Sequence, residues 1–263
     1  MSDAIQVEVS EKVALLAFNR PEAKNALRPQ DRVELGSILN DLAKRADVRA
    51  VVLSGRGDIF CAGADLKAAS GFNVSHPRNT TWSLLHDVQP ALECITRMDK
   101  PVIAAINGPA IGVGMSFALA CDLMVMDKST YMMLPFINLG LVPDGGAAWL
   151  LQRRVGYARM FESICDARKL DAETCKEWGI ANKLSEPGEA VETAMTWAKK
   201  LAASAPTAMA LTKRLARLAV TNRLEESLTL EAEFQGVCGA SAETKEAVAA
   251  FMEKRPANFD KLR

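Results

Sequence analysis

Hydrophobic and polar positions at the start of the chain follow the pattern of two strands and a helix. Residues 5–9 alternate, residues 13–18 are more continuously apolar, and residues 29–43 repeat their apolar side chains at helical spacing. Those helical positions are Val33, Leu35, Ile38, Leu39 and Leu42. The pattern predicts a β-β-α unit.

Further apolar runs end in loops that are rich in glycine. The run 50–53 leads into SGRGDIFCAGADL, and the run 102–106 leads into NGPAIGVG before a helix of small residues that reaches Ala120. The apolar pair 123–126 and 131–134 leads into LPFINLGLVPDGGAAWLL. Strands that alternate with helices in this way predict an α/β core.

The strand pattern stops at about residue 190. Helical patterns rich in Ala, Leu, Lys and Glu then continue to Glu253, with breaks expected at Pro206 and near residues 236–239. We therefore predict an α/β core over residues 1–190 and a helical region over residues 191–263.

Composition narrows the classes of function. Lys+Arg and Asp+Glu number 32 each, so the net charge gives no reason to expect nucleic acid or an anionic membrane as a partner. The six cysteines form no C-x-x-C pair, and only two histidines accompany them, so we predict no metal site. No secretory leader, membrane-spanning run or S-K-L ending is recognisable, which predicts a cytoplasmic protein.

The glycine turns and one acid are the candidate chemical groups. Where a glycine-rich turn leads from a strand into a helix, outward-pointing N–H groups can bind an anion or polarise a carbonyl. The spacing Gly108-x-x-x-Gly112-x-Gly114 fits neither a dinucleotide fingerprint nor a P-loop. Taken alone, this turn is better explained by chain geometry, and Asp144 by a turn or helix N-cap. Cys61 stands in an apolar context and is predicted to be a packed thiol.

Taken together and in order, these loops resemble those of the enoyl-CoA hydratase/isomerase (crotonase) family along nearly the whole chain. The matching segments are NRP at 19–21, KNAL at 24–27, FCAGADL at 60–66, KPVIAAING at 100–108 and LGLVP at 139–143. Each segment is a weak signal alone, whereas their ordered combination is specific.

The resemblance implies a fold, a substrate and an assembly. The fold would be α/β, a crotonase-like spiral of β-β-α units with a C-terminal helical region that makes oligomer and coenzyme A contacts. The substrate would be an acyl-CoA thioester, with coenzyme A bound as part of the substrate and no separate cofactor. The assembly would be a homotrimer or a dimer of trimers.

The resemblance also implies residue roles. The backbone N–H groups of Ala64 and Val113 would form an oxyanion hole that holds the thioester oxygen as it becomes enolate-like. Phe251 and Lys254 would reach coenzyme A from the C-terminal helix of this or a neighbouring subunit. The other expected substrate contacts are Lys24, Ala26, Ala62, Asp65, Leu66, Gly112 and Phe136. Residues 68–81 are expected to shape the acyl pocket.

The chain departs from the family's hydratases at two positions. Hydratases carry two glutamates that face the substrate, and here those positions read Ser116 and Phe136, neither of which can act as a carboxylate base. An acid stands instead at Asp144, where family isomerases place their single Asp or Glu. One carboxylate can carry a proton between two carbons, so the resemblance favours an enoyl-CoA double-bond isomerase with Asp144 as proton shuttle. Burial in an apolar pocket should raise the pKa of this carboxyl group.

Three alternatives remain open. An enoyl-CoA hydratase would hold its water through Ser116, Asp144 or another group. An aryl-CoA dehalogenase-type hydrolase would use Asp144 as nucleophile and His86 as base. A non-catalytic acyl-CoA-binding scaffold would keep the fold and lack the chemistry.

Overall fold

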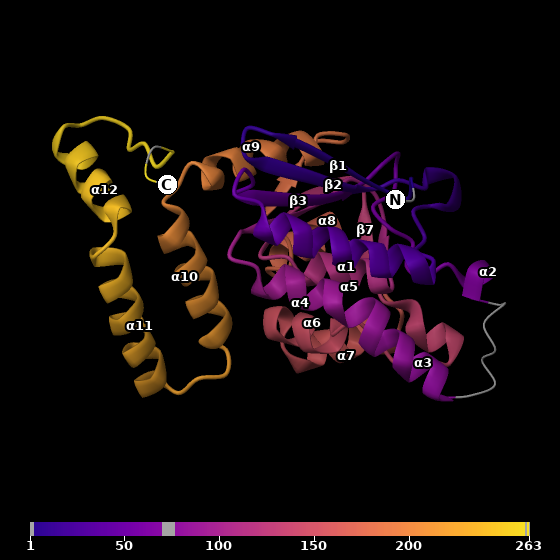
Figure 1. Cartoon of the computed structure of the whole chain (residues 1–263). Coiled ribbons are helices and arrows are strands. Elements are labelled where there is room, and N and C mark those ends of the chain that lie inside the picture. Colours follow the sequence, from indigo (N-terminus) through magenta and orange to yellow (C-terminus); the bar gives the residue numbers. More distant parts are fainter. Residues whose placement is uncertain (1–2, 70–76, 261, 263) are drawn as a thin grey trace.

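The computed structural model describes residues 3–69, 77–260 and 262 (Figure 1). Residues 70–76 of the predicted pocket segment lie outside the described residues. A six-stranded sheet forms the centre of the molecule, in the order β1-β2-β3-β4-β6-β9. Its strands are β1 (Ile5–Ser10), β2 (Val13–Phe18), β3 (Ala50–Gly55), β4 (Val102–Ile106), β6 (Leu123–Asp127) and β9 (Lys183–Ser185).

The direction of the strands decides where the connecting loops meet. β1 and β2 form an antiparallel pair, while β2, β3, β4, β6 and β9 run parallel. The loops that follow β2, β3 and β4 therefore lie at one edge of the sheet. That edge carries the glycine-rich turns predicted from the sequence and the start of α1 (Pro29–Lys44).

Helices cover both faces of the sheet because its strands bury alternate side chains on each side. On one face Val51 and Leu53 belong to a cluster with Leu35 and Leu39 of α1 and with α4 (Gln89–Arg97). On the other face Ala50 and Val52 pack with α9 (Ala190–Ala202). The contact residues of α9 recur every four positions as Ala190, Ala194, Ala198 and Ala202. Such small side chains let the helix axis approach the sheet closely.

The remaining elements surround this centre. A second sheet has the order β5-β7-β8, made of β5 (Ala110–Ile111), β7 (Tyr131–Met133) and β8 (Leu170–Asp171). The helices are η1 (Pro21–Ala23), α2 (Leu66–Ala69), α3 (Pro77–Ser83), the π-helix η2 (Leu84–Val88), α5 (Val113–Ala120), η3 (Pro135–Leu139), α6 (Ala147–Val155), α7 (Tyr157–Cys165) and α8 (Ala172–Glu177).

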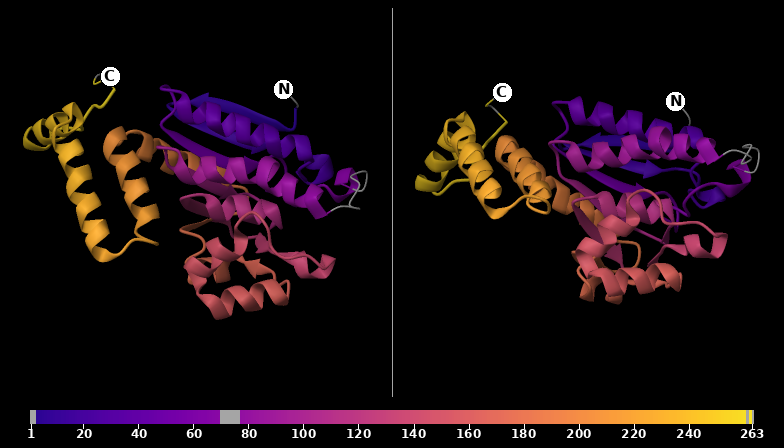
Figure 2. Two further views of the ribbon diagram at one scale, coloured as in Figure 1. Left: turned by 60° about the horizontal axis from the view of Figure 1, so that its bottom comes forward. Right: turned by 90° about the horizontal axis from the view of Figure 1, so that it is seen from below.

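The last three helices form an arm beside the sheet (Figure 2). They are α10 (Pro206–Leu218), α11 (Leu224–Gly239) and α12 (Ala242–Met252). Within the described chain α10 and α11 bury no residue. Ion pairs instead join the arm to the core: Asp122 lies 2.7 Å from both Lys213 and Arg217 of α10.

One boundary in this region differs from the sequence expectation. α9 begins at Ala190 but packs on the sheet, so it is part of the core rather than of the arm. The break expected near residues 236–239 is confirmed: α11 continues through Gly236, ends at Gly239, and is followed by a turn at residues 240–241 before α12. Gly236 costs an exposed helix only about 1 kcal/mol relative to Ala. The chain also leaves its helical path between α10 and α11.

Membrane insertion of a helix finds no support. Over the part of the chain that the structure describes, no helix combines the length and the apolar character needed to cross a bilayer.

Candidate active site

Two glycine turns lie side by side at the carboxyl edge of the sheet. A parallel bridge joins Cys61 to Ala110, with Cys61 N–H donating to Pro109 O (3.2 Å) and Ile111 N–H donating to Cys61 O (2.8 Å). The bridge brings residues 63–64 against residues 112–113, and we call these two segments the paired turns.

Glycine is required in the first of these turns. Gly63 has φ +95°, in the left-handed region, and a Cβ there would lie 2.9 Å from Ile111 O and 3.7 Å from Gly112 Cα. Gly112 also has a positive φ, of +56°. The close approach of the two backbones is thus fixed by the absence of side chains.

Each paired turn carries one backbone donor without an acceptor. Val113 is the first residue of α5, so its N–H has no intrahelical partner. Among the described residues neither Val113 N–H nor Ala64 N–H makes a hydrogen bond. Since the two turns are in contact, these donors can converge on one oxygen atom of a ligand, as the sequence predicts for an oxyanion hole.

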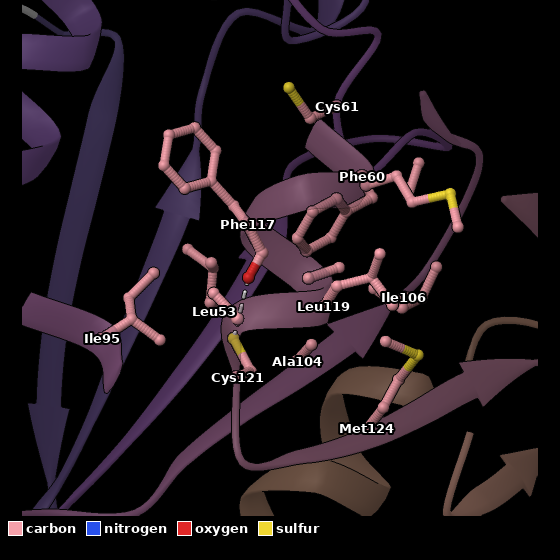
Figure 3. Close-up of a cluster of buried hydrophobic side chains, with 14 of the residues drawn as sticks. Leu53, Phe60, Cys61, Ile95, Ala104, Ile106, Phe117, Leu119, Cys121 and Met124 are labelled. Atoms are coloured by element: carbon pink, nitrogen blue, oxygen red, sulfur yellow. Dashed lines mark hydrogen bonds between the residues drawn. The ribbon is translucent and has the colours of Figure 1, made fainter. Parts of the chain in front are cut away.

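A close-packed cluster supports the turns from behind (Figure 3). Cys61, Phe60 and Phe117 are fully buried there. A Cβ at Gly114 would lie 2.7 Å from Cys61 O and 2.9 Å from Cys61 Sγ, so the second position of α5 has room only for glycine. Burial raises the pKa of the Cys61 thiol to about 12, which agrees with the predicted packed thiol.

The segments expected to hold coenzyme A also meet. Ala62 N–H donates to Lys24 O (3.0 Å), and Asp65 N–H donates to Leu27 O (3.0 Å), so residues 24–27 run beside residues 62–65. Lys24 has φ +54° and is exposed, whereas Ala26 is half-buried. Leu66 is exposed at the start of α2.

Asp65 has structural partners of its own. One carboxylate oxygen accepts from Ala68 N–H (3.1 Å), and the other lies 3.1 Å from Arg20 Nη1. These contacts lower the pKa of Asp65, with the Ala68 hydrogen bond the strongest cause. Its side chain therefore anchors the start of α2 next to the first paired turn.

Asp144 is tied to the second paired turn by its backbone. Ser116 Oγ donates to Asp144 O (3.0 Å), and a Cβ at Gly145 would lie 2.7 Å from Ser116 Cβ and 3.4 Å from Val113 Cγ2. The loop after Pro143 is thus pressed onto the first turn of α5. The backbone of Asp144 is thereby held against the first turn of α5, which begins at Val113.

The carboxyl group itself is left without a partner. Asp144 Oδ1 is buried and makes no hydrogen bond within the described chain. Burial raises the pKa of Asp144 to about 6, opposed by the positive charge of Arg32. The predicted rise in pKa is therefore present. A group with this pKa is mostly ionised at pH 7 and remains a stronger base than an ordinary Asp.

The two positions that carry glutamate in hydratases serve the fold here. Ser116 is fully buried, and its hydroxyl group donates a hydrogen bond to Asp144 O. Phe136 is also buried, and its Cζ would lie 3.9 Å from a Cβ at Gly112. An apolar ring thus stands beside the second paired turn where a second carboxylate would be needed.

Comparison with known proteins confirms the resemblance. The family model of enoyl-CoA hydratase/isomerase matches residues 8–262. The chain belongs to this family. Enzymes of the enoyl-CoA hydratase/isomerase family act on acyl-CoA thioesters, so the paired turns and Asp144 belong to an acyl-CoA enzyme.

Relatives and solved structures span nearly the whole chain. A probable enoyl-CoA hydratase of Rhodobacter capsulatus is 37% identical over 260 residues, covering 97% of each chain. The 1,2-epoxyphenylacetyl-CoA isomerase of Escherichia coli is 32% identical over 259 residues, covering 98% of this chain and 99% of its own. A crystal structure of an enoyl-CoA hydratase from Polaromonas sp. JS666 superposes with a TM-score of 0.93 at 31% identity, covering 97% of this chain and 98% of that one. The crotonase-like α/β fold is thereby confirmed.

A cavity of about 830 Å³ borders Gly145 and Gly146, the two residues after Asp144, in this enoyl-CoA hydratase/isomerase family member. It extends between α4, α6 and α10. Its apolar lining includes Leu84, Val88, Leu92, Trp149, Leu150, Ala210 and Leu218, and its charged lining is Glu93, Arg97, Asp99, Lys213, Arg214 and Arg217. The apolar part of the wall suits the hydrocarbon of an acyl group.

Two predicted contacts are not brought to the site within one chain. Phe251 lies in α12 and is 81% exposed, and Lys254 follows that helix with φ +53°. α12 lies at the opposite end of the molecule from α2 (Figure 1). A contact of these residues with coenzyme A would have to be made in a neighbouring subunit.

The sequence interpretation missed one polar residue of this region. Arg32 is half-buried beside the buried positions of α1, which are Asp31, Leu35, Leu39 and Leu42, and lies one turn before Leu35. Its Nε is buried and has no hydrogen-bond partner among the described residues. A charged residue in register with an apolar helical stripe was the available signal.

His86 does not have the contacts of a catalytic base. Its ring stacks on Trp82 at a centroid distance of 4.3 Å, and its Nδ1 lies 2.8 Å from Trp82 O. It is exposed in η2 and interacts with its own helical segment. The geometry therefore gives no support to a hydrolase that uses His86 as base.

Proposed function

We propose that this protein is an enoyl-CoA double-bond isomerase in which Asp144 transfers the proton. The observation that carries this proposal is a buried carboxyl oxygen without a partner, in the loop that packs on the turn of Val113, together with two backbone donors that have no acceptor. Both hydratase glutamate positions are occupied by groups that cannot act as a base, Ser116 and Phe136.

The proposed reaction needs one acid/base group and an oxyanion hole. Asp144 removes a proton from the carbon next to the thioester, and the electron pair moves onto the thioester oxygen. Ala64 N–H and Val113 N–H hold that oxygen while the dienolate exists. The carboxyl group of Asp144 then returns the proton two carbons further along the chain, so the atoms and electrons of substrate and product balance.

The surroundings of Asp144 suit this cycle. A pKa of about 6 leaves the group ionised at neutral pH, so that it can accept a proton, and makes its protonated form easy to regenerate. The apolar ring of Phe136 keeps the neighbourhood poor in polar groups that could activate water. These features support proton transfer over hydration.

The acyl-CoA substrate would occupy the two sides of the paired turns. We place the coenzyme A portion along residues 24–27 and 62–66, without any separate cofactor, and the acyl chain in the cavity beside Gly145. We further propose a homotrimer or a dimer of trimers. The exposed apolar residues of the arm, Leu224, Phe251 and Met252, support an assembly in which they are covered.

Hydration is the second candidate. Relatives named as hydratases, including the one from Rhodobacter capsulatus, support it. It requires a water molecule activated by Asp144 alone, since the hydroxyl of Ser116 already donates to Asp144 O.

One experiment separates these readings. The protein is incubated in deuterium oxide with a 3-enoyl-CoA and, separately, with crotonyl-CoA, and the products are identified by mass spectrometry. Isomerisation of the 3-enoyl-CoA, without formation of 3-hydroxybutyryl-CoA from crotonyl-CoA, is expected. Hydration of crotonyl-CoA as the faster reaction would overturn the proposal, and binding without any exchange or product would favour a non-catalytic scaffold.

A further inference from the structure

Arg32 is half-buried, and its buried Nε–H has no hydrogen-bond partner among the described residues. Its Nε is shielded from solvent, and its guanidinium makes no hydrogen bond and no ion pair within 4.0 Å among the described residues. A buried polar N–H is normally paired with an acceptor. The shielded Nε–H of Arg32 is therefore expected to have an acceptor outside the chain.

The position of Arg32 in the fold directs it toward the active site. Arg32 lies in the first turn of α1, one turn before the fully buried Leu35. The start of α1 and both paired turns follow parallel strands, so they share the carboxyl edge of the sheet. The charge of Arg32 acts on Asp144 and is acted on by it. The guanidinium and the proposed proton-transfer group therefore belong to one site.

The charges of three acidic residues act on the guanidinium, and each of these residues has another partner or role. Asp31 is fully buried and is paired with Arg28 at 2.8 Å and with Arg20 at 3.4 Å. Asp87, in η2, accepts from Ser83 Oγ at 2.5 Å. Asp144 is the carboxyl group of the proposed reaction. Their charges favour the protonated form of Arg32, while burial, the stronger influence, lowers its pKa.

We propose that Arg32 binds an oxygen atom on the acyl portion of the substrate, and that the natural substrate is an acyl-CoA with a neutral oxygen substituent such as a carbonyl, hydroxyl or ether. This inference deepens the proposed function, on which it rests. It makes Arg32 a residue that determines specificity.

The local charges favour a neutral oxygen over a carboxylate. Asp87 and Asp144 already lie close enough to Arg32 for their charges to act on it. A substrate carboxylate would add a third acidic group beside the carboxyl that must take up a proton, and like charges disfavour one another. A carbonyl or hydroxyl oxygen satisfies the N–H donors of Arg32 without that repulsion.

Binding of saturated acyl-CoAs tests this inference without requiring any reaction. Hexanoyl-CoA, 4-oxohexanoyl-CoA, 5-oxohexanoyl-CoA and adipyl-CoA are titrated into the full chain by calorimetry. We expect one of the two keto ligands to bind at least about tenfold more tightly than hexanoyl-CoA, as for a hydrogen bond to a charged donor. Adipyl-CoA is expected to bind no more tightly than that ligand.

Matched variants assign the preference to Arg32. In Arg32→Met, the dissociation constant of hexanoyl-CoA divided by that of the tighter keto ligand should fall to about 1. Arg45→Met removes an arginine from the other end of the same helix, where it pairs with Asp47, and should leave the ratio as in the wild type. If Arg32→Met loses its cooperative thermal transition, Arg32→Lys replaces it and should also lower the ratio, because Lys lacks the adjacent N–H donors of a guanidinium.

The outcomes separate this inference from the proposed function. Equal binding of keto and plain ligands by the wild type, or a preference that survives in the Arg32 variant, would overturn the role of Arg32. If adipyl-CoA bound most tightly of the four ligands, the claim that Arg32 prefers a neutral oxygen over a carboxylate would be wrong. A keto preference in a protein that isomerises no 3-enoyl-CoA would leave Arg32 as a specificity residue and reject the isomerase.

Discussion

The two halves of the active site are built in opposite ways. The paired turns are fixed by backbone hydrogen bonds between Cys61, Pro109 and Ile111 and by glycines that leave no space for a side chain. Opposite them stand Arg32 and Asp144, whose buried Nε and Oδ1 have no hydrogen-bond partner in the described chain, and which we call the polar wall. The first half is fixed by its backbone, whereas the charged groups of the second half make no hydrogen bond of their own within the described chain.

This difference teaches which half decides the reaction. A backbone oxyanion hole can stabilise the enolate of any acyl-CoA, so it favours a class of chemistry without choosing a member. The polar wall acts through side chains rather than through the backbone. It therefore decides where a proton goes and which acyl group fits. Removal of the base in the wall should therefore abolish proton transfer, displacement of the turns should weaken every reaction that passes through an enolate, and substitution of Arg32 should change which acyl group binds.

The largest effect is expected from the carboxyl group of the wall. Asp144→Asn keeps the size of the side chain but removes the base, and we expect kcat for 3-enoyl-CoA isomerisation to fall about 10²- to 10⁴-fold. Acyl-CoA binding should persist, because the paired turns are untouched. Full isomerisation activity in Asp144→Asn, measured beside an unchanged dissociation constant, would contradict the proton-shuttle role.

A comparable loss is expected when the turns are displaced. In Gly63→Ala the new Cβ would lie 2.9 Å from Ile111 O at a φ of +95°, so Ala64 N–H must move. Loss of one oxyanion donor costs about 10²- to 10³-fold in kcat. The measurement is kcat alongside the thermal midpoint of each variant.

Gly179→Ala is the matched control for Gly63→Ala. Gly179 has a similar positive φ of +75° but nothing within 4 Å of its Cβ position. Gly179→Ala also places an alanine at a left-handed φ, which should lower stability by about 1 kcal/mol, but it does not displace the paired turns. If both variants lost kcat equally, backbone strain rather than displacement of the donor would explain the effect.

The third expected effect is on stability: Asp144→Asn should lower activity but raise the free energy of unfolding. The pKa of Asp144 rises from an ordinary 3.8 to about 6 on folding, so ionisation disfavours the folded state. This penalty is absent below about pH 3.8 and develops as the pH rises toward about 6. Asp144→Asn should therefore raise the free energy of unfolding by up to about 3 kcal/mol at pH 8 and by about half as much at pH 5.

Urea denaturation at the two pH values measures this gain. Asp41→Asn, an exposed position on α1, should change the free energy of unfolding by less than about 0.5 kcal/mol at either pH. A variant at Asp144 that is no more stable at pH 8 than the wild type would show that the carboxylate is better solvated than its burial indicates.

The two halves also differ in how far the sequence predicts them. FCAGADL and GPAIGVG encode the turns directly, because glycine is required where backbones meet, and the resemblance assigned Ala64 and Val113 correctly to adjacent turns. The resemblance of the loop at 139–143 likewise located Asp144 as the candidate acid. Their catalytic roles stay predictions.

Long-range packing decides what the sequence could not show. The partial burial of Arg32 depends on the packing of α1 against η2, which lies far from it in the chain. The same limit applies to α9, whose alanines read as one more helix of the C-terminal region although they cover the sheet. Periodicity gives the buried face of a helix but not the surface against which that face packs.

The smallest expected effect joins the two members of the polar wall. Asp144 must be ionised to accept the proton, so kcat/KM should rise about tenfold per pH unit below about pH 6 and level off above it. Arg32 lowers the pKa of Asp144, so Arg32→Met should move this midpoint to higher pH, whereas Arg45→Met should not move it. A pH–rate profile with an unchanged midpoint in Arg32→Met would mean that the guanidinium does not act on the ionised carboxylate. The specificity role of Arg32 would then have to stand on the binding of keto acyl-CoAs alone, and the two side chains of the wall would act independently.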